Sequence, residues 1–183
     1  IKAKILYVKI SAVIIAFNEE AKIANAVRSA AWADEVLVVD SGSTDATRQI
    51  AADLGARVLT REWTGFAEQK QFATDNAAND WILSLDADEV ISDRLRDEIR
   101  GLDLSSVGAA GFRIPRLSHY LGREIRHGGW YPDLQLRLFD RRRGQWSPLI
   151  IHESFQLEND AGVARLREVI HHFSVDGALH HHQ

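Results

Sequence analysis

The chain has 183 residues, of which 45% are hydrophobic and 26% are charged, and its formal net charge is -4. This composition is ordinary for one globular domain, and the charge balance does not favour nucleic acid as a partner. There is no cysteine, which excludes disulfides, thiolate metal sites and a cysteine nucleophile and fits a cytoplasmic, reducing location.

The first hundred residues alternate between apolar runs and helical patterns. We expect strands over residues 10–17, 35–40 and 56–60 and from Trp81, and helices over residues 19–30, 45–54, 66–76 and 93–100. Asn18 is the expected cap of the first helix, and Thr44 or Asp45 that of the second. Because the strands are apolar throughout, the pattern predicts an α/β fold with a mostly parallel sheet covered by helices on both faces.

The character of the chain changes near residue 105, where aromatic residues and β-like runs become frequent. We expect strands within Ala110–Ile114, Leu134–Phe139 and Val163–Ile170. The prediction is a single domain over residues 1–183, with a first half over about 5–104 and a β-rich half over about 105–174. Residues 175–183 are read as a tail in which three histidines resemble a tag remnant, and they carry no functional argument.

The most informative segment runs from Trp81 to Glu89, where an apolar strand ends in three carboxylates. Asp86 and Asp88 are two residues apart, so on a strand both side chains point to the same side. Carboxylates that close repel each other unless a cation lies between them. Hard oxygen ligands suit Mg²⁺ or Mn²⁺ carrying substrate phosphates. This segment therefore predicts metal-assisted chemistry on a phosphorylated substrate, with Asp86 and Asp88 as metal ligands.

Polar clusters follow two other strands, at Phe17–Glu19 and at Asp40–Ser43. Ligands bind at the carboxyl ends of parallel strands, so three clusters at one edge favour a ligand site over simple helix capping. Asp40 can accept a hydrogen bond from a ligand, and Gly42 allows a close backbone approach, although an Asp that begins a turn is the alternative. Lys70 can meet a base or a phosphate, or else lie solvated on the surface.

The second half carries four further candidates. Asp133 follows a proline and neighbours aromatic residues that lower the local dielectric, which suits a general base. Arg137, near the run Arg141–Arg143, can neutralise phosphate, whereas that run alone reads as a solvated turn or a contact with anionic lipid. His152 can complete a metal shell and Glu153 can act as a base, or the two can be structural.

Together these residues resemble the inverting family 2 glycosyltransferases of the GT-A fold, and in particular the bacterial subgroup that builds lipopolysaccharide core sugars. The resemblance covers residues 10–174 and rests on the segments 13–19, 38–45 and 85–89, with support from Gly128–Asp133 and from His152 and Glu153. It implies a metal-dependent transfer from a nucleotide-sugar, most simply a UDP-sugar, to a saccharide or lipid-linked saccharide.

The resemblance also assigns roles to individual residues. Phe17, Glu19 and Asp40 would line the nucleoside pocket, Asp86 would contact the ribose or the metal, and Asp88 would hold the cation on the diphosphate. Asp133 matches the catalytic carboxylate of the family, although Pro132 replaces the acid that usually precedes it, and Glu153 is the second candidate. A lipid-linked acceptor would imply peripheral contact with the inner face of the cell membrane.

Two other classes of protein stay open. An apolar strand followed by Asp-x-Asp also resembles the nucleophile motif of haloacid dehalogenase-type phosphatases, with Asp86 as nucleophile and Asp88 as acid. In that class the motif normally lies on the first strand, whereas three predicted strands precede it here. The third reading is a nucleotide-sugar-binding domain that has lost turnover.

Overall fold

In a computed structural model of the chain, residues 7–126, 131–147, 154–158 and 162–175 are described, with residues 174 and 175 described by their backbone only. The helices are α1 (Ile23–Ala30), α2 (Thr47–Asp53), α3 (Phe66–Asn76) and α4 (Asp93–Arg100), with a 3-10 turn η1 (Arg141–Arg143). The strands are β1 (Ile10–Ala16), β2 (Glu35–Asp40), β3 (Arg57–Thr60), β4 (Trp81–Asp86), β5 (Glu89–Ile91), β6 (Ala109–Tyr120), β7 (Arg123–Glu124), β8 (Asp133–Asp140), β9 (Gly144–Trp146), β10 (Phe155–Leu157), β11 (Gly162–Arg165) and β12 (Ile170–Val175).

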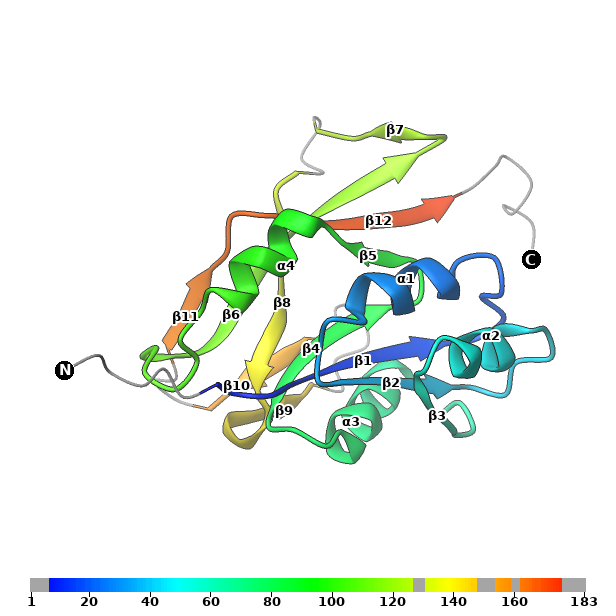
Figure 1. Ribbon diagram of the computed structural model, residues 1–183, viewed down its shortest axis with the longest axis horizontal. Coiled ribbons are helices and arrows are strands. Elements are labelled where there is room, and N and C mark those ends of the chain that lie inside the picture. The colour runs from blue at the N-terminus through cyan, green and yellow to red at the C-terminus, as the bar shows by residue number, and fades with distance from the viewer. Residues whose placement is uncertain (1–6, 127–130, 148–153, 159–161, 176–183) are drawn as a thin grey trace.

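One mixed sheet organises the molecule, in the order β3-β2-β1-β4-β8-β6-β12-β5, with β11 and β7 also paired to β6. The first four of these strands are parallel, as predicted. β8 runs antiparallel to both β4 and β6, which joins the two halves in one sheet. Figure 1 shows the β6–β7 hairpin and the end of β12 extending beyond the helices at the top of the view.

Side chains that alternate along β1 explain why helices cover both faces of the sheet. Ile14 packs into a core with α1, α2 and α4, whereas Val13 and Ile15 pack into a second core with α3, β9 and β10. Successive residues of a strand point to opposite faces, so a strand buried on both sides is apolar along most of its length. The apolar strands of the sequence therefore correctly predicted a doubly covered sheet.

The start of α1 differs from the prediction. The helix begins at Ile23, and Asn18 lies outside it with a left-handed φ of 52°. The Asn18 Oδ1 atom accepts a hydrogen bond from the Thr44 amide at 2.9 Å, so this side chain joins two loops instead of capping a helix. In α2 the N-cap position belongs to Ala46, although Asp45 still accepts from the Thr47 amide at 3.0 Å.

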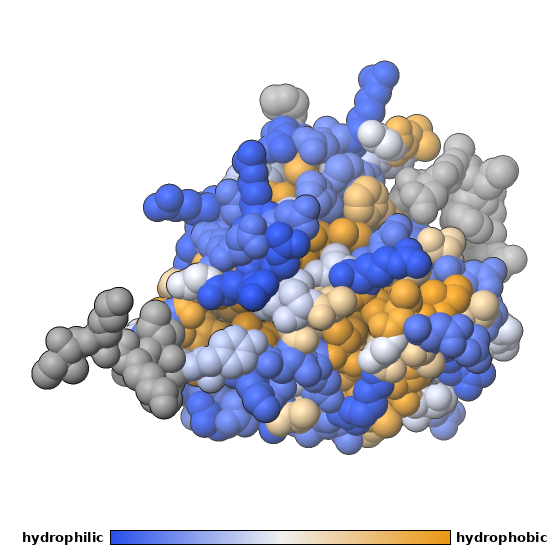
Figure 2. All heavy atoms as spheres, in the orientation of Figure 1, coloured by the Kyte–Doolittle hydropathy of each residue, from blue (hydrophilic) through white to orange (hydrophobic). Residues whose placement is uncertain are grey.

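The predicted strand Val163–Ile170 is two strands, β11 and β12, because the chain turns between Arg165 and Ile170. β5 was not predicted, since its three residues pair with the distant strand β12. No helix in the described part of the chain is both long and apolar enough to cross a membrane. Figure 2 shows polar side chains over most of the face in view, with apolar ones visible between the helices.

Candidate functional site

A cleft lies at the edge of the sheet where the parallel strands β1, β2 and β4 end. The strand register pairs Ala16 with Asp40 and Ile15 with Asp86, so the ends of the three strands lie side by side. The cleft has a volume of about 690 Å³, and the segments that follow β1, β2, β3 and β4 line it together with β12. This is the usual place for a ligand in a parallel α/β sheet.

Asp88 and His172 face each other in this cleft. The Asp88 Oδ2 atom lies 3.4 Å from the His172 Nε2 atom, and both side chains are largely buried. The Phe173 amide donates to the Asp88 carbonyl at 2.9 Å, which fastens β12 to the loop after β4. With metal–ligand bonds of about 2.1 Å, neighbouring octahedral ligands are about 3 Å apart. The pair therefore fits two ligands of one divalent cation.

His172 was not predicted from the sequence. The available signal was two adjacent histidines that follow the apolar pair Val169 and Ile170, because within one strand, here β12, successive side chains point to opposite sides and one of them must face the cleft. The Nδ1 atom of His172 lies 3.3 Å from the Ser118 hydroxyl, which orients the ring with Nε2 toward Asp88. His152, the predicted metal ligand, and Glu153 lie outside the described residues.

Asp86 lies between two buried cations. Its Oδ1 atom is 3.0 Å from the Lys70 ammonium, and its Oδ2 atom accepts from the Arg137 guanidinium at 2.8 Å. Burial raises the pKa of Asp86, but the positive charges of Arg137 and Lys70 outweigh it and hold the pKa far below its usual range. Asp86 is therefore an ionised carboxylate at the floor of the cleft, with its charge already balanced by protein.

The charge network continues away from the cleft. Arg137 also donates to the fully buried Glu89 at 2.6 Å, and burial raises the Glu89 pKa despite the opposing effect of Arg137. Arg116 lies 3.7 Å from Glu89 and donates to Asp133 at 2.7 and 2.8 Å. The network thus connects Asp86 to Asp133, the predicted base.

Asp133 is the first residue of β8, and each of its carboxylate oxygens accepts a hydrogen bond. Arg116 donates to Oδ2, and the Gln135 amide donates to Oδ1 at 2.6 Å. Asp133 is half-buried and, within the described residues, is not part of the cleft lining. These two contacts fix the orientation of the Asp133 carboxylate. Its role as a base stays a prediction.

Asp40 and Gly42 shape the turn that follows β2. The buried Asp40 carboxylate accepts from the amides of Gly42 and Ser43 at 3.0 and 2.9 Å and from the Ser43 hydroxyl. Gly42 has a φ of 93°, a left-handed conformation that glycine adopts without strain. Neither residue lines the cleft in the described structure, so their nucleotide-binding roles stay predictions.

Three exposed aromatic side chains, Phe17, Trp63 and Phe66, form the rim of the cleft. The Trp63 and Phe66 rings meet edge to face with centroids 4.7 Å apart. Beside them, burial raises the pKa of Glu19, and Lys22 partly offsets this rise. Exposed aromatic rings at the edge of a polar cleft offer flat apolar surfaces for a base or a sugar ring. Of this rim, only Phe17 was predicted.

Comparisons with known proteins relate the chain to glycosyltransferases. The family description "Glycosyl transferase family 2" matches residues 11–155. The chain is 32% identical over 168 residues to the lipopolysaccharide core biosynthesis glycosyltransferase LpsC of Rhizobium meliloti, a match that covers 88% of this chain and 62% of LpsC. It is 54% identical over 92 residues to an uncharacterized glycosyltransferase of Rickettsia felis, covering 50% of this chain and 32% of that protein.

Two solved structures are similar to this chain in fold. Glucosyl-3-phosphoglycerate synthase from Mycobacterium tuberculosis, crystallised with Mn²⁺, UDP and glucosyl-3-phosphoglycerate, is 28% identical with a TM-score of 0.51, over 61% of this chain and 44% of that one. TarS 1-349 from S. aureus with UDP-GlcNAc superposes with a TM-score of 0.64 over 92% of this chain and 59% of that one. At 17% identity this second likeness shows the fold alone.

The sheet and the cleft at its edge define a GT-A type nucleotide-sugar transferase fold. The chain belongs to glycosyl transferase family 2, as its motifs predicted. It spans 32% of the length of the Rickettsia felis relative and 62% of the length of LpsC.

Proposed function

We propose that this chain binds a nucleoside diphosphate sugar in the cleft and transfers the sugar, with inversion, to a saccharide or lipid-linked saccharide. The single observation that carries the proposal is the Asp88–His172 pair, which lies beside an aromatic rim and the ionised Asp86. A relative 28% identical to this chain was crystallised with UDP and Mn²⁺, which supports a UDP-sugar as the donor class.

Asp88 and His172 would hold a divalent cation, which when bound neutralises the charge that grows on the departing diphosphate. A carboxylate alone suits Mg²⁺ or Mn²⁺, and the added imidazole nitrogen favours Mn²⁺, because Mg²⁺ prefers oxygen ligands. Phe17, Trp63 and Phe66 offer stacking surfaces to the base of the donor. Asp86 can accept hydrogen bonds from the ribose while Lys70 and Arg137 keep it ionised.

Asp133 is the proposed base. It would take the proton from the acceptor hydroxyl as the hydroxyl oxygen bonds to the anomeric carbon and the bond from that carbon to the diphosphate breaks. A single displacement inverts the anomeric configuration. Arg116 and Gln135 hold the Asp133 carboxylate in one orientation, which supports this role. Glu153 is the alternative base.

A lipid-linked core saccharide is the acceptor class that the similarity to LpsC supports. Peripheral membrane contact through the arginines of η1 belongs to the same proposal. Two of the three are already engaged, because Arg141 donates to the Thr74 and Ala77 carbonyls at the end of α3 and Arg142 donates to the Asp140 carboxylate. The phosphatase reading has lost its support, because Asp86, its nucleophile, is paired with two cations and the chain belongs to another family.

The test is release of the nucleotide from UDP-, GDP- and ADP-sugars, with and without Mn²⁺. We expect Mn²⁺-dependent release from one donor class, loss of that release in Asp88→Ala, and normal release in the exposed control Asp97→Ala. Asp133→Asn should bind the nucleotide normally and turn over about 10²–10⁴-fold more slowly, the usual contribution of a general base.

Other outcomes would contradict the proposal in distinguishable ways. Normal turnover in Asp133→Asn would reject the base, and nucleotide binding without transfer or hydrolysis would favour the non-catalytic domain. Release of phosphate from a simple phosphoester without any sugar donor would restore the phosphatase.

A further inference from the structure

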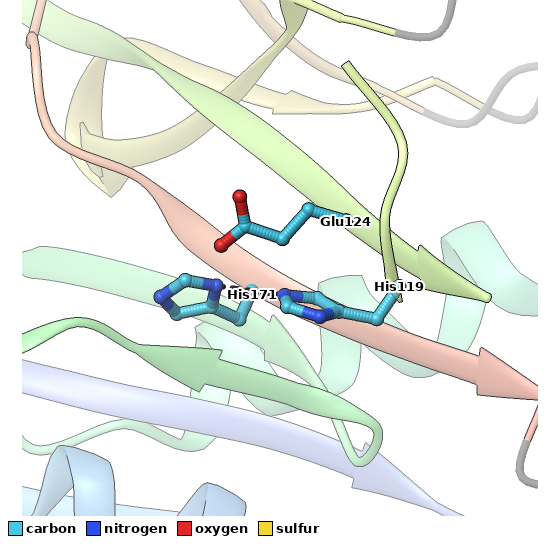
Figure 3. Close-up of side chains that lie close together, drawn as sticks. All are labelled: His119, Glu124 and His171. Carbon is cyan, nitrogen blue, oxygen red and sulfur yellow. Dashed lines mark hydrogen bonds between the residues drawn. The ribbon is translucent and has the colours of Figure 1, made fainter. Parts of the chain in front are cut away.

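We propose that His119, Glu124 and His171 form a second metal site, suited to Zn²⁺, that joins the β6–β7 hairpin to β12. Figure 3 shows the two imidazole rings side by side, with the Glu124 side chain extending toward them from the neighbouring strand. One ligand atom from each residue lies within 4.8 Å of the others.

Backbone pairing brings the three side chains together. His119 on β6 is the direct cross-strand partner of Glu124 on β7. His171 on β12 is paired with Leu117, which is two residues from His119 on β6 and therefore on the same side of the strand. The His119 ring stacks on Phe173 with centroids 4.5 Å apart, which restrains its orientation. Two strand ladders thus hold the ligands in register.

The spacing of the two imidazole nitrogens is close to that of a tetrahedral zinc site. The His119 Nε2 and His171 Nδ1 atoms are 2.9 Å apart. Bonds of about 2.0–2.1 Å to zinc place two nitrogen ligands about 3.3 Å apart, so a shift of a few tenths of an ångström in the two rings admits the ion, while the Glu124 carboxylate turns toward it. Two imidazoles and one carboxylate leave the fourth position to water or to another ligand.

The site is separate from the nucleotide cleft. His171 and His172 are neighbours on β12 and point to opposite sides, His172 into the cleft and His171 toward a surface hollow that also contacts Ser29 and Trp32. The two sites also differ in chemistry, because two imidazoles prefer Zn²⁺ over the oxygen-seeking Mg²⁺. Metal binding here does not depend on the proposed transferase activity.

Arg126 competes with a metal for Glu124. Its guanidinium donates to the Glu124 carboxylate at 2.8 Å, and both side chains are about half exposed. A metal must draw Glu124 away from this exposed ion pair, which is weak because solvent screens it. Arg126 therefore provides a variant whose effect is opposite in sign to that of the ligand variants.

The experiment is a Zn²⁺ titration in competition with a chromophoric chelator. It uses the full chain with the substitutions His180→Ser, His181→Ser and His182→Ser, which remove the run of three histidines near the end of the sequence. We expect one strong site. His119→Ala and His171→Ala should weaken it by more than about 100-fold, the upper end of what the loss of an outer-shell partner costs.

Two variants on the exposed hairpin keep the test informative if the histidine variants fail to fold. Glu124→Gln should weaken Zn²⁺ binding and Arg126→Gln should tighten it, whereas a purely structural His–His hydrogen bond predicts no change in either. His172→Ala should leave this site intact. The proposal is overturned if the tail variant binds no Zn²⁺, if the hairpin variants leave the affinity unchanged, or if His172→Ala removes the same site.

Discussion

Asp86 and Asp88 are two residues apart but have different partners, which gives them different chemistry. Both line the cleft at the edge of the sheet, Asp86 as the last residue of β4 and Asp88 from the turn that follows it. The partners that distinguish Asp86 from Asp88 were not evident from the sequence. Lys70 and Arg137 neutralise Asp86, whereas Asp88 meets His172, and both arrangements depend on contacts between segments far apart in the chain.

Arg137 should be the most sensitive residue of the buried network. Arg137→Met would leave Asp86 and Glu89 with their main cation removed, and breaking a buried ion pair from one side costs about 3–5 kcal/mol. Urea unfolding followed by tryptophan fluorescence measures this loss. The control Arg94→Met removes an exposed arginine of α4 and should cost less than about 0.5 kcal/mol, the usual range for surface substitutions. Equal losses in the two variants would contradict the assigned network.

At the scale of elements, the periodicity of apolar residues correctly predicted helices whose own apolar face packs against the core. The bounds of α3 are those predicted, and the apolar face predicted for α1 is the face that it buries. The pattern did not indicate β5, which is only three residues long and exists through pairing with β12. It also did not reveal Asn18 as a loop connector, because the same residue type caps helices and joins loops.

The packing of the small β9–β10 sheet can be tested at the scale of elements. Trp146 donates to Gln71 and Thr74 of α3, and Phe155 stacks on Phe139, so the pair covers one face of the main sheet. A Cβ atom on Gly144 would collide with the Gln156 carbonyl and lie 2.6 Å from the Phe155 ring.

Gly144→Ala should therefore destabilise the fold by about 1–3 kcal/mol, the usual cost of overpacking. Thermal unfolding measures it, with Gly108→Ala as the control, because a Cβ there meets nothing within 4 Å. A Gly144→Ala variant as stable as this control would show that β9 and β10 are not packed in this way.

At the scale of the whole molecule, the alternating first half was predictable and the second half was predictable only as β-rich. Parallel strands joined by helices follow a local rule, whereas the pairing of β8 with both β4 and β6 joins distant segments. The family resemblance supplied the fold where periodicity could not, and the comparisons confirmed it.

The stability of the molecule should fall in acid, partly through Glu35. Burial raises the pKa of Glu35, but hydrogen bonds from Ser11 and the Ala78 amide, together with Arg57, outweigh it and lower the pKa. A carboxylate with a lowered pKa stabilises the native state at neutral pH, and this contribution disappears as the pH falls below the ordinary value of about 4.3 and through the native pKa.

Glu35→Gln should thus lower the free energy of unfolding at pH 7 and make it less dependent on pH between about 5 and 3. Urea unfolding at several pH values measures both effects. The exposed control Glu158→Gln should keep the pH dependence of the parent chain. An unchanged pH dependence in Glu35→Gln would contradict the role given to this carboxylate.

The most direct measurement of the central claim is calorimetric titration of UDP into the chain with and without Mn²⁺, for the parent, His172→Ala and the control Asp97→Ala. We predict that Mn²⁺ strengthens UDP binding in the parent and the control, and that this gain disappears in His172→Ala. Equal Mn²⁺-dependent binding in His172→Ala and the parent would contradict the assignment of Asp88 and His172 as the metal-holding pair of the cleft.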